Sequence, residues 1–410
     1  MSDPSEGRIR SFLAEARPQA EAFLAALVRQ PSDNPPGDCA AHAAQAATLL
    51  EAMGFTAERH AVPAAEARRV GMISATNLVI RHRFDPGPVI ALNAHGDVVP
   101  PGEGWTQDPY GAAVVDGWMY GRGVAVSKSD FATYAFALRA LRESGAALHG
   151  TVELHLTYDE ESGGEIGPAW LLKQGISKPD YAICAGFSYA VIEAHNGCLH
   201  LEVEVTGRSA HAAKPWTGVD ALEAANCVLG ALYAWRGGLA RRVSAVPGIG
   251  APQMTVGLIS GGINTNVVPD RITFRLDRRM VPEENPAGVE AELRALIEDA
   301  ARAFPEARVA VRRILLATPL RPIAGAERLA AALTHRATAV FGEPIGASGV
   351  PLYTDARHYA EAGVPVVLYG AGPRSIEEAN AHRADERLPL ADLHRATEVV
   401  ALAVKDLLSG

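Results

Sequence analysis

The chain has 410 residues, of which 48% are hydrophobic and 21% are charged. This is the composition of a globular protein with room for one large and one smaller domain. Its 38 basic and 47 acidic residues give a net charge of -9, and this acidic balance argues against nucleic acid as a partner. No stretch of about 20 apolar residues is present to span a membrane. The four cysteines show no CxxC spacing, so we expect reduced thiols and a cytoplasmic protein.

The first half of the chain alternates strand and helix patterns. Residues 1–28 are typical of an amphipathic helix and lack the apolar core of a signal peptide. Four strand patterns follow, at residues 75–84, 88–100, 151–162 and 179–188. A helix pattern at residues 131–148 lies between the second and the third of them. Polar residues stand where these strands end, which predicts an open α/β sheet with a site along that edge.

The pattern changes near residue 198. Strands with one wet face alternate with two helical segments, in the order 198–207, 220–235 (helix), 253–262, 271–281, 288–304 (helix) and 308–318. We therefore predict an inserted α+β domain over residues 198–313. Residues 1–197 and 314–410 are expected to form one discontinuous α/β domain.

Two groups of metal-binding residue types follow strands of the first domain. His95 and Asp97, in HGD, lie on the same side of their strand, and a metal-bound imidazole commonly donates its second N–H to such a carboxylate. In TYDEES, three consecutive carboxylates repel one another unless a cation relieves them. Glu160 and Glu161 can divide the work, with one on a metal and the other as general base on the metal's water.

Four more segments complete the pattern: GRSAHAAKP at 207–215, GGINTNVVPD at 261–270, YTDARHYAEAGVPVV at 353–367 and ANAHRADER at 379–387. In this order the segments resemble the M20 family of metallohydrolases, which includes acetylornithine deacetylase, succinyl-diaminopimelate desuccinylase, aminoacylase and the glutamate carboxypeptidases. The resemblance runs from about residue 75 to about residue 390. It implies a mixed-sheet α/β catalytic domain with an inserted α+β, ferredoxin-like domain that serves as dimerisation or lid domain.

The resemblance also implies roles for single residues of the first domain. The expected metal ligands are His95, Glu161 and His382. Glu160 matches the general base, and Asp97 matches the carboxylate that orients the first histidine. The implied cofactor is a divalent metal, with Zn²⁺ expected and Mn²⁺ or Co²⁺ as alternatives.

Three residues of the inserted domain match positions that handle the substrate. His211 matches a residue that reaches the active site of a partner subunit and polarises the scissile carbonyl, which implies a homodimer. Asn266 and Arg279 match positions that hold the substrate's carbonyl and carboxylate. A planar guanidinium suits a carboxylate, so a small carboxylate is the expected substrate.

The chain departs from the family pattern at two metal-ligand positions. In GRGVAVSKSD, Val126 stands where the family has an aspartate that bridges two ions, and the position of a second acidic ligand aligns with Gly186. A bridging carboxylate offsets the repulsion between two dications, so its loss disfavours a paired site. His95, Glu161 and His382 remain, and a His, His, Glu set suffices for one catalytic zinc. One ion per protomer is therefore expected.

The residues that follow Val126 offer a competing interpretation. Ser127 and Lys128 could act as nucleophile and base if Lys128 were desolvated, although a structural role for the lysine is favoured. We expect Asp130 to cap the helix that begins near Phe131, with the alternative that it reaches into the space left by Val126.

These observations predict a hydrolase that cleaves the C–N bond of an N-acyl amino acid or a similar small carboxylate. Three alternatives stay open: a single-metal hydrolase or lyase for a substrate such as an amino-substituted aromatic acid, a metal-free Ser-Lys amidase, and an inactive binding protein. The doubled glutamate at 160 and 161 argues against the last of these, because it has no evident structural use.

Overall fold

The computed structural model describes residues 3–409 and divides the chain into two compact units. The first unit comprises residues 1–193, 322–348 and 354–410. The second comprises residues 194–321 with the short segment 349–353. The second unit is thus an insertion in the first. It runs from residue 194 to residue 321, whereas the sequence predicts boundaries at 198 and 313.

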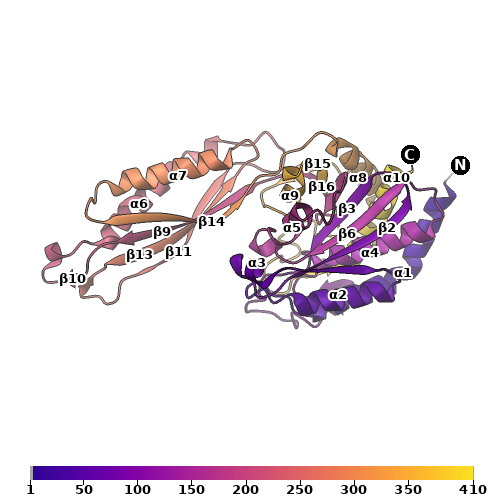
Figure 1. Cartoon of the computed structure of the whole chain (residues 1–410), viewed down its shortest axis with the longest axis horizontal. Coiled ribbons are helices and arrows are strands. Elements are labelled where there is room, and N and C mark those ends of the chain that lie inside the picture. Colours follow the sequence, from indigo (N-terminus) through magenta and orange to yellow (C-terminus); the bar gives the residue numbers. More distant parts are fainter. Residues whose placement is uncertain (1–2, 410) are drawn as a thin grey trace. The chain divides into compact units, whose positions relative to one another are not determined.

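The first unit is built from helices and strands that alternate along the chain (Figure 1). Up to the insertion they are α1 (Pro4–Arg29), α2 (Ala40–Ala52), β1 (Ala57–Ala61), α3 (Ala64–Arg69), β2 (Thr76–Asp85), β3 (Val89–His95), β4 (Ala113–Val115), β5 (Trp118–Tyr120), α4 (Lys128–Glu143), β6 (Gly150–Thr157), η1 (Glu160–Ser162), α5 (Pro168–Lys173), β7 (Tyr181–Cys184) and β8 (Val191–His195). After it come α8 (Ala326–Phe341), β15 (Ala347–Val350), α9 (Ala356–Glu361), β16 (Val366–Leu368), β17 (Arg387–Pro389) and α10 (Leu390–Leu408).

The main sheet has eight strands in the order β1-β2-β6-β3-β7-β16-β8-β15. Its centre is parallel: β3 pairs with β6 and β7, and β16 pairs with β7. Strands β1 and β2 extend it in antiparallel fashion. Because parallel strands point the same way, the carboxyl ends of the four central strands meet at one edge, which is where such folds place their sites.

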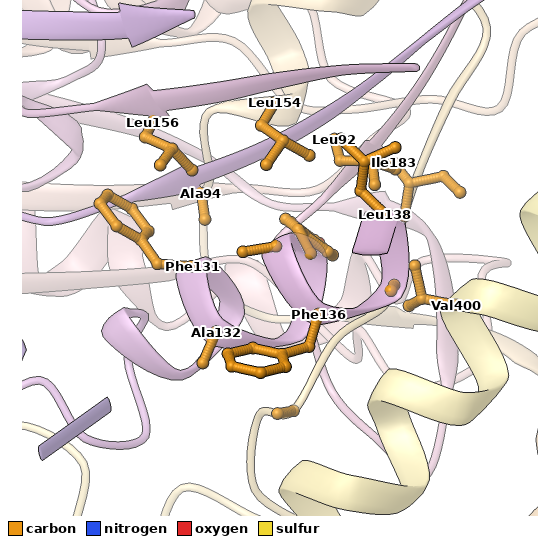
Figure 2. Packing of buried hydrophobic residues seen from close by; sticks show 14 of the residues in the cluster. Leu92, Ala94, Phe131, Ala132, Phe136, Leu138, Leu154, Leu156, Ile183 and Val400 are labelled. Carbon is orange, nitrogen blue, oxygen red and sulfur yellow. The ribbon is translucent and has the colours of Figure 1, made fainter. Parts of the chain in front are cut away.

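The core of this unit lies between the sheet and a layer of helices. Leucines 154 and 156 of β6 face α4, while His155 between them points to the opposite face and bonds Tyr359 of α9. Figure 2 shows α4 wedged between the central strands and α10, with side chains that are buried or nearly so: Leu92, Ala94, Phe131, Ala132, Phe136, Leu138, Leu154, Leu156, Ile183 and Val400. This packing fixes the strand ends that carry the site.

The second unit is a sheet covered on one face by two helices (Figure 1). Its elements are β9 (Gly197–Thr206), β10 (Ala210–His211), η2 (Pro215–Thr217), α6 (Ala221–Arg236), η3 (Leu239–Arg241), β11 (Gln253–Gly261), β12 (Val267–Val268), β13 (Arg271–Met280), α7 (Pro286–Ala301) and β14 (Arg308–Ala317). The four long strands run in the order β11-β13-β9-β14, all antiparallel. Alternate residues of β9, from Leu199 to Val205, join the helices in one core.

The expected fold class, a mixed α/β domain with an inserted α+β domain, is confirmed. Within residues 3–409, no helix is both long enough and apolar enough to cross a bilayer.

Candidate active site

The polar residues after β3 and β6 come together because the two strands are parallel and in register. His95, the last residue of β3, pairs with Thr157, the last residue of β6. Asp159, Glu160 and Glu161 follow after Tyr158, and the last two begin the short helix η1. The sheet edge therefore holds an imidazole beside a run of carboxylates, as the sequence predicts.

Asp97 organises this edge. Its buried carboxylate accepts hydrogen bonds from Asn34 Nδ2 at 3.0 Å and from the backbone N–H groups of Glu160 and Glu161 at 3.3 and 3.2 Å. His95 Nδ1 lies 3.4 Å from Asp97 Oδ1 and 2.9 Å from the Asp97 carbonyl oxygen. These contacts hold the imidazole with Nε2 facing the glutamates, 3.9 Å from Glu160 Oε2.

Three side chains at this edge are placed to hold a cation, and a fourth lies beside one of them. One ligand atom each from His95, Glu160 and Glu161 lie within 4.8 Å of one another. His382 Nε2 adds a fourth, 3.3 Å from Glu161 Oε1. Nitrogen and carboxylate donors in this number suit a divalent transition metal such as Zn²⁺. Two of the three predicted metal ligands, His95 and Glu161, belong to this group, and the third, His382, contacts Glu161.

The electrostatics of the edge also fit a cation. Burial disfavours a charged His95, but the carboxylates of Asp97 and Glu160 outweigh burial and hold its pKa well above the usual value. Burial raises the pKa of Glu160 to about 8 and the pKa of the nearby Asp355 well above its ordinary range. Asp355 Oδ2 is buried without a hydrogen-bond partner. Crowded, desolvated carboxyl groups of this kind are stabilised when a positive ion is added.

The loop that carries Val126 is tied down by a buried ion pair. Arg122 Nη1 lies 2.6 Å from Glu386 Oε2, and each side chain is 1% exposed. The other oxygen of Glu386 accepts from the backbone N–H groups of Ala125 and Val126 at 3.1 and 3.2 Å. The backbone of Val126 is therefore held in place by Glu386, and its side chain offers no atom that could bind a metal.

Ser127 and Lys128 both have structural partners. Ser127 Oγ donates to the carbonyl of His95 at 3.0 Å and accepts from the N–H of His95 at 3.1 Å. Lys128 Nζ donates to the carbonyl of Gln30 at 3.1 Å, and burial lowers its pKa to about 8. Lys128 is thus desolvated, as a base would need to be, but the contacts of Ser127 with His95 and of Lys128 with Gln30 favour the structural interpretation of the pair.

The prediction that Asp130 caps the helix that begins near Phe131 is wrong. Helix α4 begins at Lys128, so Asp130 lies inside its first turn. Its carboxylate accepts from the N–H of Ala371 at 2.6 Å and from the N–H of Gly186, outside the helix, rather than capping it. A Cβ atom at Gly186 would lie 2.8 Å from the backbone of Leu368, which explains why no acidic side chain occupies that position.

The three substrate-binding candidates lie in the second unit. His211, on β10, is exposed and pairs with Val267 of β12, directly after Asn266. Arg279 is at the far end of the sheet, near the end of β13, where its guanidinium contacts both oxygens of Asp277 at 2.9 to 3.1 Å. The structure thus brings His211 and Asn266 together before β13 begins, but places Arg279 near the end of β13.

Three residues of the site escaped the sequence analysis. Asn34 bridges Asp97 and Ser162, Glu386 holds the Val126 loop, and Asp355 packs against Gly164 beside the glutamates. Glu386 and Asp355 stand in the segments ANAHRADER and YTDARHYAEAGVPVV, whose polar residues were the available signal.

Comparison with known proteins decides the family. A family model described as peptidase family M20/M25/M40 matches residues 91–406. The chain belongs to this family. A succinyl-diaminopimelate desuccinylase of Methylobacterium sp. (strain 4-46) is 30% identical and the match covers 93% of this chain and 94% of that protein. An acetylornithine deacetylase of Myxococcus xanthus is 29% identical, with 88% and 90% covered.

Structures of family members share the fold. A Bacillus subtilis protein described as a dinuclear metal-binding peptidase from the M20 family superposes with a TM-score of 0.67 at 16% identity and covers 96% of this chain and 99% of that one. The predicted family is confirmed, and so is the expectation of a hydrolase that acts on C–N bonds. As members of this family are metal-dependent, the edge that carries His95, Glu160 and Glu161 is the candidate active site.

Proposed function

We propose that this M20 enzyme cleaves the amide bond of an N-acyl amino acid or a similar small carboxylate, with one metal ion at the edge formed by β3 and β6. The observation that carries the proposal is the convergence of His95, Glu160 and Glu161 within 4.8 Å, with His382 beside Glu161. The desuccinylase and deacetylase relatives remove acyl groups by their names, which supports this substrate class.

Each side chain has a distinct task in this proposal. His95, Glu161 and His382 would hold the ion, which when bound polarises a carbonyl and makes water more acidic. Glu160 takes the proton from the attacking water and passes it to the leaving nitrogen. Asp97 keeps His95 in one orientation through the contact at Nδ1. His211 and Asn266 stabilise the developing oxyanion, and Arg279 binds the substrate carboxylate.

A single ion is proposed because two donor positions are empty of ligand atoms. The Bacillus subtilis relative is described as dinuclear, whereas this chain presents Val126 and Gly186 where the family pattern has acidic residues. The carboxylate of Asp130 accepts from the N–H of Gly186, at one of these two positions, and from the N–H of Ala371. Without a bridging anion, a second dication a few ångströms away is strongly repelled.

Metal analysis tests the number of ions. The full chain and its His95→Ala/Glu161→Gln variant are loaded with excess Zn²⁺, desalted and analysed for zinc per protomer. We expect the variant to contain one ion fewer than the parent, because only the edge site is removed. A difference of two ions would show a paired site, with Asp130 or another group as the bridge.

Activity with and without a chelator tests the reaction. N-acetyl and N-succinyl amino acids are the substrates to compare, and we expect hydrolysis that chelation abolishes and added Zn²⁺ restores. Hydrolysis that is insensitive to chelation would favour the metal-free alternative based on Ser127 and Lys128.

A further inference from the structure

A second group of metal-binding side chains lies on the second unit, on strands β9 and β13. The two strands are antiparallel, with Cys198 opposite Arg279 and His200 opposite Asp277. Side chains alternate along a strand, so Cys198 and His200 share one face while Leu199 between them enters the core with α6 and α7. The register therefore places a thiol, an imidazole and a carboxylate side by side.

The distances among these three groups match the edges of a tetrahedral metal site. Cys198 Sγ lies 3.2 Å from His200 Nε2 and 3.7 Å from Asp277 Oδ1, and His200 Nε2 lies 3.3 Å from Asp277 Oδ2. Metal–ligand bonds of about 2.0 to 2.3 Å at tetrahedral angles give ligand–ligand distances of about 3.3 to 3.8 Å. All three ligand atoms lie within 4.8 Å of one another.

We propose that Cys198, His200 and Asp277 form a second metal site, specific for a thiophilic divalent cation such as Zn²⁺. Sulfur, nitrogen and oxygen donors together favour this class of ion over Mg²⁺ or Ca²⁺. The cation displaces the thiol proton to solvent and is held by the thiolate, the imidazole and one carboxylate oxygen, with the fourth position open to water.

The same residues do not fit a nucleophilic thiol with a histidine relay. In such a relay one imidazole nitrogen faces the thiol and the other faces the carboxylate. Here the single atom Nε2 faces both Cys198 Sγ and Asp277 Oδ2, at 3.2 and 3.3 Å. One imidazole nitrogen that faces both a sulfur and a carboxylate is the arrangement expected of a ligand set, in which Asp277 contributes one of its two oxygens.

Solvent can reach the site through His200 and Asp277, and Asp277 also binds Arg279. Cys198 is buried, whereas the side chains of His200 and Asp277 are 34% and 32% exposed. Arg279 contacts both oxygens of Asp277, and a cation requires only one of them. The other oxygen stays available to the guanidinium of Arg279, so the ion and this contact are compatible.

Cobalt binding tests this site separately from the active site. A thiolate on Co²⁺ gives a near-ultraviolet charge-transfer band, and the edge site offers Co²⁺ only nitrogen and oxygen donors from His95, Glu160 and Glu161. In a Co²⁺ titration of the full chain we expect this band, and we expect Glu161→Gln to keep it. Cys198→Ser should abolish it, whereas Cys227→Ser, which changes a half-buried thiol elsewhere in the unit, should not.

A second variant covers the case in which Cys198→Ser does not fold, since Cys198 is fully buried. His200→Ala changes a partly exposed side chain, and it should lower the apparent affinity read from the band by about tenfold or more. Circular dichroism and thermal melting confirm the fold of each variant. The proposal is overturned if the full chain gives no band, if the band survives Cys198→Ser, or if a folded His200→Ala variant binds Co²⁺ with unchanged affinity.

Discussion

At the scale of single residues, the two adjacent glutamates are expected to fail in different ways. Glu160→Gln keeps size and hydrogen bonding but cannot take a proton from water, so kcat should fall by about 10² to 10⁴ while the zinc content equals that of the parent. Glu161→Gln should lose both rate and zinc, because an amide oxygen carries no charge to oppose the ion. Steady-state kinetics and elemental analysis on the same samples check both halves.

Each of the two variants, Glu160→Gln and Glu161→Gln, is a control for the other, because the substitutions are chemically identical and the positions are adjacent. Near-normal kcat in a folded Glu160→Gln variant would remove the general base from the proposed reaction. Equal zinc contents in both variants would remove Glu161 from the ligand set.

The ion pair between Arg122 and Glu386 gives a prediction on stability. Arg122 also donates to the carbonyls of Pro101 and Arg383 at 3.1 and 3.2 Å. Arg122→Ala leaves a carboxylate buried without its partner, which costs about 3 to 5 kcal/mol of unfolding free energy. Arg10→Ala, which removes a pair that is 51% and 25% exposed on its two sides, should change that free energy by about 0 to 1 kcal/mol. Urea denaturation that gives equal losses for both would contradict the argument.

At the scale of elements, strand β6 carries a network that makes stability depend on pH. Burial raises the pKa of Glu153, but hydrogen bonds from His155, Ser177 and Arg81 outweigh burial and lower it to about 2, from 4.5 in the unfolded chain. The folded state therefore binds this proton less readily than the unfolded state. Its contribution is fully present above pH 4.5 and is lost as the pH falls toward 2, on the order of 3 kcal/mol in total.

Glu153→Gln isolates this contribution. The difference in unfolding free energy between the parent and the variant should be constant above about pH 5 and shrink as the pH falls below it. Denaturation series at several pH values measure it. A difference that does not change between pH 5 and the lowest pH at which the parent folds would show that Glu153 has the same pKa in both states.

The order of strands and helices also explains which parts of the site could be predicted. His95 and Glu161 were accessible from the sequence because His95 ends one strand and Glu161 follows another, and parallel strands end at one edge. Asp130 was not, because its partners Ala371 and Gly186 follow other strands and no local pattern announces them. Asp355 and Glu386 act on the site from segments far along the chain, so only tertiary structure connects them to it.

At the scale of the whole molecule, the second unit raises a question about the assembly. His211 lies on the ribbon of β10 and β12, before β13 begins, and Arg279 lies near the end of β13. The part of β13 between its first residue, Arg271, and Arg279 spans eight residues. This is a length of about 26 Å at about 3.3 Å per residue. A small N-acyl amino acid does not span this distance. If both residues serve one substrate, they come from two protomers, which supports the proposed homodimer.

A mixing experiment tests whether His211 acts across the dimer. His211→Ala and Glu160→Gln should each be inactive as homodimers, because each lacks one group of the proposed reaction. After the two proteins are denatured together and refolded in equal amounts, half of the dimers are mixed, and in each of these one site combines an intact Glu160 with an intact His211. The expected activity is about a quarter of that of the parent treated in the same way. If His211 served its own chain, every site in the mixture would lack one of the two groups and no activity would return. Analytical ultracentrifugation of the mixture shows whether dimers have formed. Dimers without activity would contradict the proposal that His211 acts in the site of the partner protomer. A parent protein that is monomeric and fully active would rule out the homodimer itself.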